Sequence, residues 1–378
     1  MTPRLAAITL NLIPTLGSIR ICRLLDFFGS PELILHADET MLRQVRGIGP
    51  ELAAAIRSWK TTVNAEKELE LADKAGASVT TIFDNTYPAP LRELPDPPIV
   101  LYHHGQWFPS DGERSVAIVG SRQATPYGRL TTRKFASELA ECGVTVISGL
   151  AKGIDTEAHN AALVTGGRTI AIIGSGLNRL YPVENAPLAA RISDGRGAVV
   201  SEFPMNMGPS RTTFPMRNRI VSGWSKATLV VEAPARSGAL ITAHTANEQG
   251  RLVYAVPGPV DRTSSDGCHS LIREGAILAT CARHIIDDFH WADTSPAQQE
   301  LALFPSEEPT PSVSSRAHSL SEQEQQVLYS INMGFRDLNT LCSSTGLTNG
   351  ELTTALVRLQ MQRLILPEPG GLFRPADS

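Results

Sequence analysis

The sequence predicts an α/β protein whose core is a doubly wound parallel sheet, an extended Rossmann-like fold. Short apolar runs alternate with helix patterns through the middle of the chain, which is typical of parallel strands covered by helices on both faces. Nearly every run also ends in small or polar residues, as tight strand-to-helix turns require. The expected strands are 116–119, 144–147, 169–173, 198–200, 228–231, 252–256 and 276–278.

Two glycine loops in the first part of this core predict an anion site. Strand 116–119 ends at the first loop and strand 144–147 at the second, and each loop leads into a helix. Thr125 predicts the first helix start, because its hydroxyl caps free amides before Pro126. Exposed amides and the helix dipole favour negative charge. The loop residues expected at the site are Gly120, Ser121, Arg122, Thr125, Ser148, Gly149, Lys152 and Gly153.

The sequence divides into four segments. Residues 1–78 have helical patterns, 79–291 hold the strand-helix alternation, and 320–378 form a small tail domain. Residues 292–319 are rich in Pro, Ser and Glu and predict a flexible linker. Five prolines within 88–98 predict that 79–112 is an extended passage between domains.

The N-terminal segment predicts an all-helical domain that is SAM-like or helix-hairpin-helix-like. A long helix is expected over about 50–74, and the turn before it reads Arg46, Gly47, Ile48, Gly49, Pro50. This turn resembles a helix-hairpin-helix element, whose amides contact a DNA phosphate without reading sequence. A glycine turn inside a small helical bundle is the alternative, and both remain open.

The tail segment predicts a winged-helix-like domain with three helices and a strand pair. The expected helices are 322–330, 335–345 and 348–363, followed by strands within 365–373. A winged helix normally indicates duplex DNA, yet this segment holds more acidic than basic residues. Protein contact or plain stabilisation therefore fits the tail better than DNA binding.

The composition excludes several classes of protein. A formal net charge of -4 excludes a uniformly cationic coat, so a polyanion site must be a local patch. The five cysteines are scattered without a CxxC pair, which indicates a reducing compartment and no zinc site. The start of the chain lacks a cleavage site, and no apolar stretch of about 18 residues predicts a membrane span. A cytoplasmic protein is expected.

The stretch 211–219, RTTFPMRNR, joins arginines with an aromatic residue just before an expected helix over 220–224. Arginines neutralise phosphates, and an exposed Phe214 ring stacks on an unpaired base for about 1 to 3 kcal/mol. A core position for Phe214 is the alternative, but nearby loops add further charge and hydroxyls. The groove is therefore suited to a run of phosphates, with further contacts expected from Phe214, Arg217, Arg219, Ser237 and Thr242.

The sequence does not predict an enzyme, a metal site or a cofactor. Neither GxxxxGK[ST] nor GxSxG occurs, and the histidines are dispersed without metal spacing. Glu202 and Glu232 at strand ends form a candidate acid/base pair for glycosidic-bond cleavage. Asp155 is more simply a helix cap and His159 a packed histidine.

The core resembles the DNA processing protein A family, also called DprA or Smf. The resemblance covers about residues 85–285, and the helical head and winged-helix-like tail also fit a three-domain member. The motifs that carry it are Val119-Gly120-Ser121-Arg122, Tyr127-Gly128, Ser148-Gly149-Leu150-Ala151, Gly153-Ile154-Asp155, Ala158-His159, Tyr181-Pro182, Ser201-Glu202, Phe214-Pro215, Arg217-Asn218-Arg219, Glu232, Ser237-Gly238, Pro257-Gly258, Gly267-Cys268 and Leu271 to Ala276.

The resemblance implies a cytoplasmic protein that binds single-stranded DNA and dimerises through the Rossmann-like domain. In natural transformation, such a protein protects incoming strands and loads the RecA recombinase onto them. Asn218 and Gly238 join the DNA groove by the same resemblance. Lys152 stands where the family commonly has arginine, so charge is kept without a bidentate phosphate grip.

Two alternatives remain. The Rossmann variant also resembles the lysine decarboxylase-like phosphoribohydrolases, which cleave the N-glycosidic bond of a nucleotide. Their hallmark is PGGxGTxxE, whereas residues 232–239 read EAPARSGA and lack the glycine pair. The other alternative is a relic groove in a protein that acts only as a recombinase adaptor, which the retained arginine cluster argues against.

Overall fold

The computed structural model describes residues 1–291, 322–333, 337–361, 364–368 and 372–375. The chain forms two compact units, Met1–Leu301 and Ala302–Ser378. The expected linker over 292–319 lies outside the described residues.

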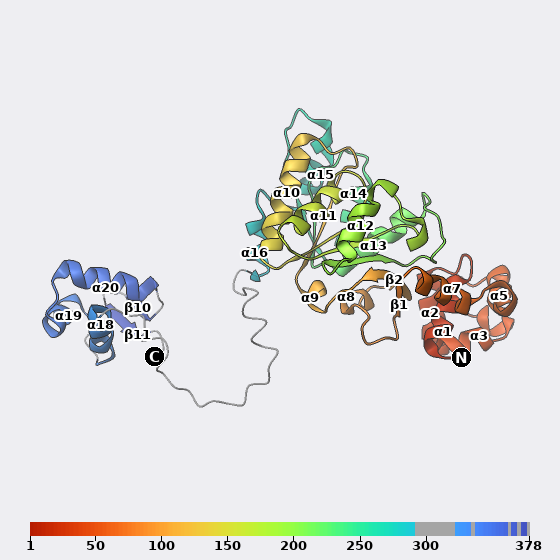
Figure 1. Ribbon diagram of the computed structural model, residues 1–378, viewed down its shortest axis with the longest axis horizontal. Helices are drawn as coiled ribbons and strands as arrows, with labels where there is room; N and C mark the ends of the chain where they lie inside the picture. The colour runs from red at the N-terminus through yellow and green to blue at the C-terminus, as the bar shows by residue number, and fades with distance from the viewer. Residues whose placement is uncertain (292–321, 334–336, 362–363, 369–371, 376–378) are drawn as a thin grey trace. The chain divides into compact units, whose positions relative to one another are not determined.

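A nine-stranded sheet forms the centre of the first unit (Figure 1). The seven expected strands are all present, and the neighbours among them run parallel. Two further strands, β1 and β2, extend one edge with antiparallel pairing. The spatial order is β1 (Ser78–Thr81), β2 (Val100–Gly105), β6 (Gly197–Ser201), β5 (Thr169–Ile172), β4 (Thr145–Ser148), β3 (Ser115–Val119), β7 (Ala227–Val230), β8 (Leu252–Ala255) and β9 (Ile277–Leu278).

The strand order reverses direction between β3 and β7. From β3 the chain adds β4, β5 and β6 toward one edge, then returns to place β7, β8 and β9 on the other side. Ligands of doubly wound sheets bind at such a reversal, beyond the carboxyl ends of the strands. The topology therefore points to the ends of β3 and β7.

Helices cover both faces of the sheet, and β3 shows the alternation. Val116 and Ile118 pack with one helical layer, whereas Ala117 and Val119 pack with the other. The first layer contains α10 (Pro126–Glu141), α11 (Ile154–Val164), α12 (Ala186–Ser193) and α16 (Ala282–Asp288). The second contains α8 (Ala89–Arg92), α13 (Thr213–Trp224), α14 (Gly238–Glu248) and α15 (Asp266–Arg273).

The passage 79–112 differs from the expected connection between domains. It contributes β1 and β2 to the sheet, and β2 pairs with both β1 and β6. Short helices α8 and α9 (Ser110–Glu113) complete it. The prolines lie outside the two strands, where no ladder hydrogen bond is lost.

The helical head packs directly on the sheet. Ile8 of α1 and Ile56 of α5 share one hydrophobic cluster with Ala171 of β5 and Val199 of β6. The expected long helix over 50–74 is wrong, because the chain breaks it near Ser58 and Asn64 into three helices. The division at residue 78 and the SAM-like or helix-hairpin-helix-like class stay predictions. The head comprises α1 (Pro3–Leu12), α2 (Ser18–Phe28), α3 (Pro31–His36), α4 (Glu39–Leu42), α5 (Pro50–Arg57), α6 (Trp59–Thr62) and α7 (Ala65–Lys74).

Within its described residues, the second unit contains three helices and an antiparallel strand pair, in the expected order. Val327, Leu341 and Leu356, one from each helix, are buried in one cluster together with Ile365 of the first strand. The winged-helix-like class stays a prediction, and residues 369–371 between the two strands lie outside the described residues. The elements are α18 (Glu322–Asn332), α19 (Leu338–Thr345), α20 (Asn349–Met361), β10 (Ile365–Glu368) and β11 (Leu372–Pro375).

Among the helices that the structure describes, none combines the length and the apolar character needed to span a bilayer.

Candidate nucleic-acid interface

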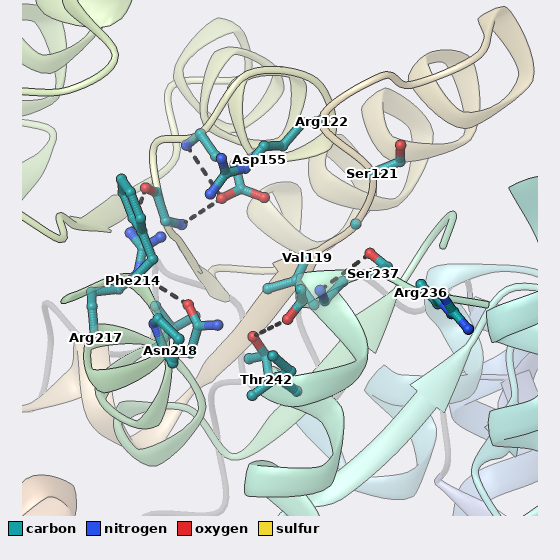
Figure 2. A pocket seen from close by; sticks show the side chains of 18 of the residues that line it. Val119, Ser121, Arg122, Asp155, Phe214, Arg217, Asn218, Arg236, Ser237 and Thr242 are labelled. Atoms are coloured by element: carbon teal, nitrogen blue, oxygen red, sulfur yellow. Dashed lines mark hydrogen bonds between the residues drawn. The ribbon is translucent and has the colours of Figure 1, made fainter. Parts of the chain in front are cut away.

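A cavity of about 480 Å³ lies at the carboxyl end of β3, where the strand order reverses. Figure 2 shows side chains from the loop after β3, from α13 and from the start of α14 gathered around it. The structure thus brings together segments more than a hundred residues apart. The predicted residues that line this pocket are Gly120, Ser121, Arg122, Gly149, Phe214, Arg217, Asn218, Ser237, Gly238 and Thr242.

Backbone contacts fix the loop after β3. The amide of Ser121 donates to the carbonyl oxygen of Glu232 at 2.7 Å, and the amide of Ile154 donates to the Ser121 carbonyl at 3.2 Å. Gly153 has φ +83°, and a Cβ there would lie 2.3 Å from the Ser121 carbonyl oxygen. The loop is held between the end of β7 and the start of α11, and position 153 requires glycine.

The chain's own carboxylates occupy the amides that were expected to bind an anion. Glu232 accepts hydrogen bonds from the Thr125 amide at 2.8 Å and the Thr125 hydroxyl at 2.7 Å, at the start of α10. Asp155 accepts from the amides of Gly149 at 3.1 Å and Ala151 at 3.3 Å. Burial raises the pKa of Asp155, and the charge of Arg217 opposes the rise. In this structure the two loops are thus held by the chain's own carboxylates, and ligand binding by these helix starts stays a prediction.

The charge of the pocket comes from arginine side chains. Four guanidinium groups line it, and Asp155 carries the one carboxylate among its described lining residues. Within the described part of the chain, none of these four arginines forms an ion pair, and three of them are exposed. We call them the rim arginines: Arg122, Arg211 and Arg236. The pocket is therefore strongly cationic although the chain as a whole carries -4.

Arg217 supports the floor of the pocket and is 5% exposed. Its Nη1 donates to the carbonyl oxygens of Gly149 and Ile172, and its Nε donates to Asn218 Oδ1 at 3.2 Å. Burial lowers its pKa to about 10, so the side chain stays charged at neutral pH. A Cβ at Gly149 would lie 2.7 Å from the guanidinium, which explains the glycine.

Phe214 forms the aromatic part of the pocket. Its half-buried ring lies 5.0 Å from the Arg122 guanidinium carbon, in cation–π geometry. The ring belongs to α13, which begins at Thr213 rather than at the expected residue 220. The stretch 214–219 is therefore helical, and its side chains point in different directions.

Five predicted contacts lie outside the pocket lining. Ser148 is buried and donates to the Ile118 carbonyl, and Thr125 caps α10 by accepting from the Gly128 amide. Gly153 spaces the two loops, and Lys152 forms an exposed ion pair with Glu184 at 2.7 Å. DNA contact by these four residues stays a prediction.

Arg219 is the fifth of these residues, and it lies beneath the surface. It pairs with the buried Glu202 and, at 3.2 Å, with Asp96. Its Nη2 also donates to the Ser18 hydroxyl of the head at 3.0 Å. The structure therefore joins Arg219 to the head and the sheet instead of to the pocket.

Both glutamates of the candidate acid/base pair, Glu202 and Glu232, form structural contacts. Glu232 binds Thr125, and Glu202 binds Arg219; neither lines the pocket. His159 is fully buried, as expected, and shares a hydrogen bond with the Thr169 hydroxyl at 2.6 Å. Among the described residues, no group of three His, Cys, Asp or Glu is placed to hold a metal ion.

Two cationic pocket residues, Arg211 and Arg236, are missing from the contacts that the sequence predicts. Arg211 stands in the arginine-rich stretch 211–219. Arg236 immediately precedes Ser237, whose side chain accepts from the Ala239 amide at 3.3 Å and caps α14. A cation beside a predicted hydroxyl contact was the available signal.

Fold and site together define a Rossmann-like α/β protein with a cationic pocket at the strand-order reversal. Residues 78–290 match the family described as DNA recombination-mediator protein A. The chain is 32% identical to Protein Smf of Synechocystis sp., with 95% of each chain covered, and 42% identical to DNA processing protein DprA of Streptococcus pneumoniae, with 56% of this chain and 74% of that one covered. The chain belongs to the DNA recombination-mediator protein A family.

Two solved structures show the same core. The X-ray structure of DprA from Streptococcus pneumoniae has a TM-score of 0.65 and 32% identity, covering 76% of this chain and 98% of that one. DNA processing protein A from Helicobacter pylori, whose structure is described for its single-stranded DNA binding mode, has a TM-score of 0.51 and 29% identity, covering 56% and 96%. The α/β fold with a mostly parallel sheet is thus shared.

Proposed function

We propose that this protein binds single-stranded DNA in the arginine-lined pocket. The observation that carries the proposal is the cluster of three rim arginines without ion pairs around a cavity that also presents the Phe214 ring. Exposed guanidinium groups without ion pairs can neutralise phosphates, and this releases the counterions condensed on the nucleic acid. The release drives binding to any nucleic-acid strand. These phosphate contacts do not depend on the base sequence.

The aromatic ring favours a single strand over a duplex. A stacking platform needs a base with a free face, and the bases of a duplex already stack on one another. Phe214 is half-buried at the pocket, so one unpaired base fits against it while the phosphates meet the rim arginines. The Helicobacter pylori relative, described for its single-stranded DNA binding, supports this choice.

The wider role rests on family membership. The protein acts in the cytoplasm during natural transformation, where it protects incoming strands and loads the RecA recombinase onto them. It works as a homodimer through the Rossmann-like domain and binds DNA without acting as an enzyme. Glu202 and Glu232 contact Arg219 and Thr125 of the chain itself, which supports DNA binding over hydrolysis of a nucleotide.

Fluorescence anisotropy tests the proposal directly. A labelled oligothymidine and its duplex are titrated with the wild-type protein across a salt series, with a nucleoside monophosphate as a competitor. We expect salt-sensitive binding that prefers the single strand and is not displaced by the mononucleotide, because one phosphate engages few of the rim arginines. Duplex preference, or release of free base from the mononucleotide, would contradict the proposal.

A further inference from the structure

The loop between β5 and α12 lies next to the pocket without lining it. Its two short helical turns are η1 (Leu177–Arg179) and η2 (Val183–Asn185), and Tyr181 lies between them with 43% of its surface exposed. The Tyr181 ring centroid is 5.8 Å from that of Phe214, with the two planes tilted by 54°. Tyr181 therefore extends the aromatic surface beyond the pocket.

Polar contacts hold this loop in place. The buried Asn185 side chain donates to the Leu150 carbonyl at 2.8 Å and to the Thr156 hydroxyl at 2.9 Å. Leu150 lies in the loop that supplies Gly149 and Ala151 to the pocket. The position of Tyr181 is therefore fixed relative to the pocket before any ligand arrives, which lowers the ordering cost of binding.

We propose that a bound single strand leaves the pocket over Phe214 and continues onto Tyr181, whose ring stacks on a further unpaired base. This inference rests on the proposed function and extends its site by one subsite. Every base has a π-face, so the contact accepts any sequence. With one base stacked on Phe214 and the next on Tyr181, the two bases no longer stack on each other. This arrangement also opposes their pairing with a second strand.

The ion pair beside Tyr181 adds a phosphate contact to this subsite. Lys152 Nζ lies 2.7 Å from Glu184 Oε1, and both side chains are more than half exposed. The hydrogen bond to Glu184 raises the pKa of Lys152, which keeps the ammonium charged. An exposed pair of this kind is weak, so a phosphate of the arriving strand replaces Glu184 at the ammonium.

Oligothymidines of increasing length separate this subsite from the pocket. The variants are Tyr181→Leu, Tyr181→Phe and the control Phe83→Leu, which removes an aromatic residue of similar exposure, 42%, from outside the pocket lining. We expect Tyr181→Leu to weaken binding about tenfold for longer strands and to leave the shortest binding strand unchanged. Tyr181→Phe and Phe83→Leu should match wild type, because the first keeps the ring and the second is remote.

Glu184→Gln gives a change of the opposite sign. Removal of the carboxylate frees Lys152 for a phosphate, so binding of the longer strands should tighten about two- to threefold. A general loss of structure cannot produce tighter binding. Equal or weaker binding by Glu184→Gln would remove Lys152 from the subsite.

Photo-crosslinking covers the case in which Tyr181→Leu fails to fold. A strand carrying 5-iodouracil at successive positions is irradiated with the wild-type protein, and the crosslinked residues are mapped by mass spectrometry. A crosslink at Tyr181 is expected from one position. Wild-type binding without a Tyr181 crosslink, or with Tyr181→Leu unchanged at every length, would overturn this inference and leave the pocket intact. Absence of wild-type binding would instead refute the proposed function.

Discussion

The arginines around the pocket form two groups that share sequence character but not surroundings. Arg217 and Arg219 are buried, at 5% and 8% exposure, and they bind carbonyl oxygens or carboxylates of the chain itself. The rim arginines are exposed and form no ion pair within the described residues. Arg211, Arg217 and Arg219 stand within nine residues of one another. Arg217 and Arg219 lie in α13, which turns them toward different partners, whereas Arg211 precedes the helix.

The difference teaches how the protein supports a cationic surface. A buried guanidinium needs acceptors around it, and in return it cross-links the elements that supply them. Arg219 joins α13 to the head and to the end of β6, while Arg217 joins it to the ends of β4 and β5. The buried pair holds α13 and its Phe214 in place, which leaves the rim arginines free for a ligand.

The largest expected effect is the loss of stability caused by Arg219→Ala. The substitution leaves Glu202, and in part Asp96, as buried carboxylates without a cation. We expect the free energy of unfolding to fall by about 3–5 kcal/mol, measured by urea denaturation. Arg122→Ala is the matched control and should change it by less than about 0.5 kcal/mol. Similar losses in both variants would erase the distinction between the two groups.

Acid should act on the buried framework and spare the rim. Burial lowers the pKa of His159 to about 3 from an ordinary value near 6.5. The contribution of neutral His159 to the free energy of unfolding is complete above pH 6.5. It is lost as the pH falls toward 3, because the unfolded chain binds the proton at a higher pH than the folded chain does. Between pH 7 and 5 we expect a loss of about 2 kcal/mol from this residue.

Urea denaturation at several pH values checks this expectation. His159→Asn should flatten the dependence in part, since His103, whose pKa burial lowers to about 4, contributes in the same direction. An identical pH dependence in wild type and His159→Asn would contradict the buried, neutral state of the histidine.

Patterns local in sequence predicted most of the fold, and about two thirds of the predicted contact residues line the pocket. The seven core strands and the loops at Gly120 and Gly149 were recognised because an apolar run and the turn after it lie side by side in the chain. Strands β1 and β2 were missed, since they flank a segment crowded with prolines.

Long-range partners explain the rest. Arg219 and Asp96 are 123 residues apart, and Glu232 and Thr125 are 107 residues apart. The sequence shows these residues one by one but not that they meet. The sequence therefore predicts a DNA contact for Arg219 and an anion at the start of α10, but it does not show that Glu202 and Glu232 contact these two places.

The salt dependence of binding tests the central claim most directly. A variant with Arg122, Arg211 and Arg236 all changed to glutamine keeps the buried arginines and removes the rim charge. Each lost phosphate contact lowers the slope of log affinity against log salt by about 0.7, so we expect a decrease of about 2 with the melting temperature unchanged. A slope equal to that of wild type would show that the strand binds elsewhere on the protein.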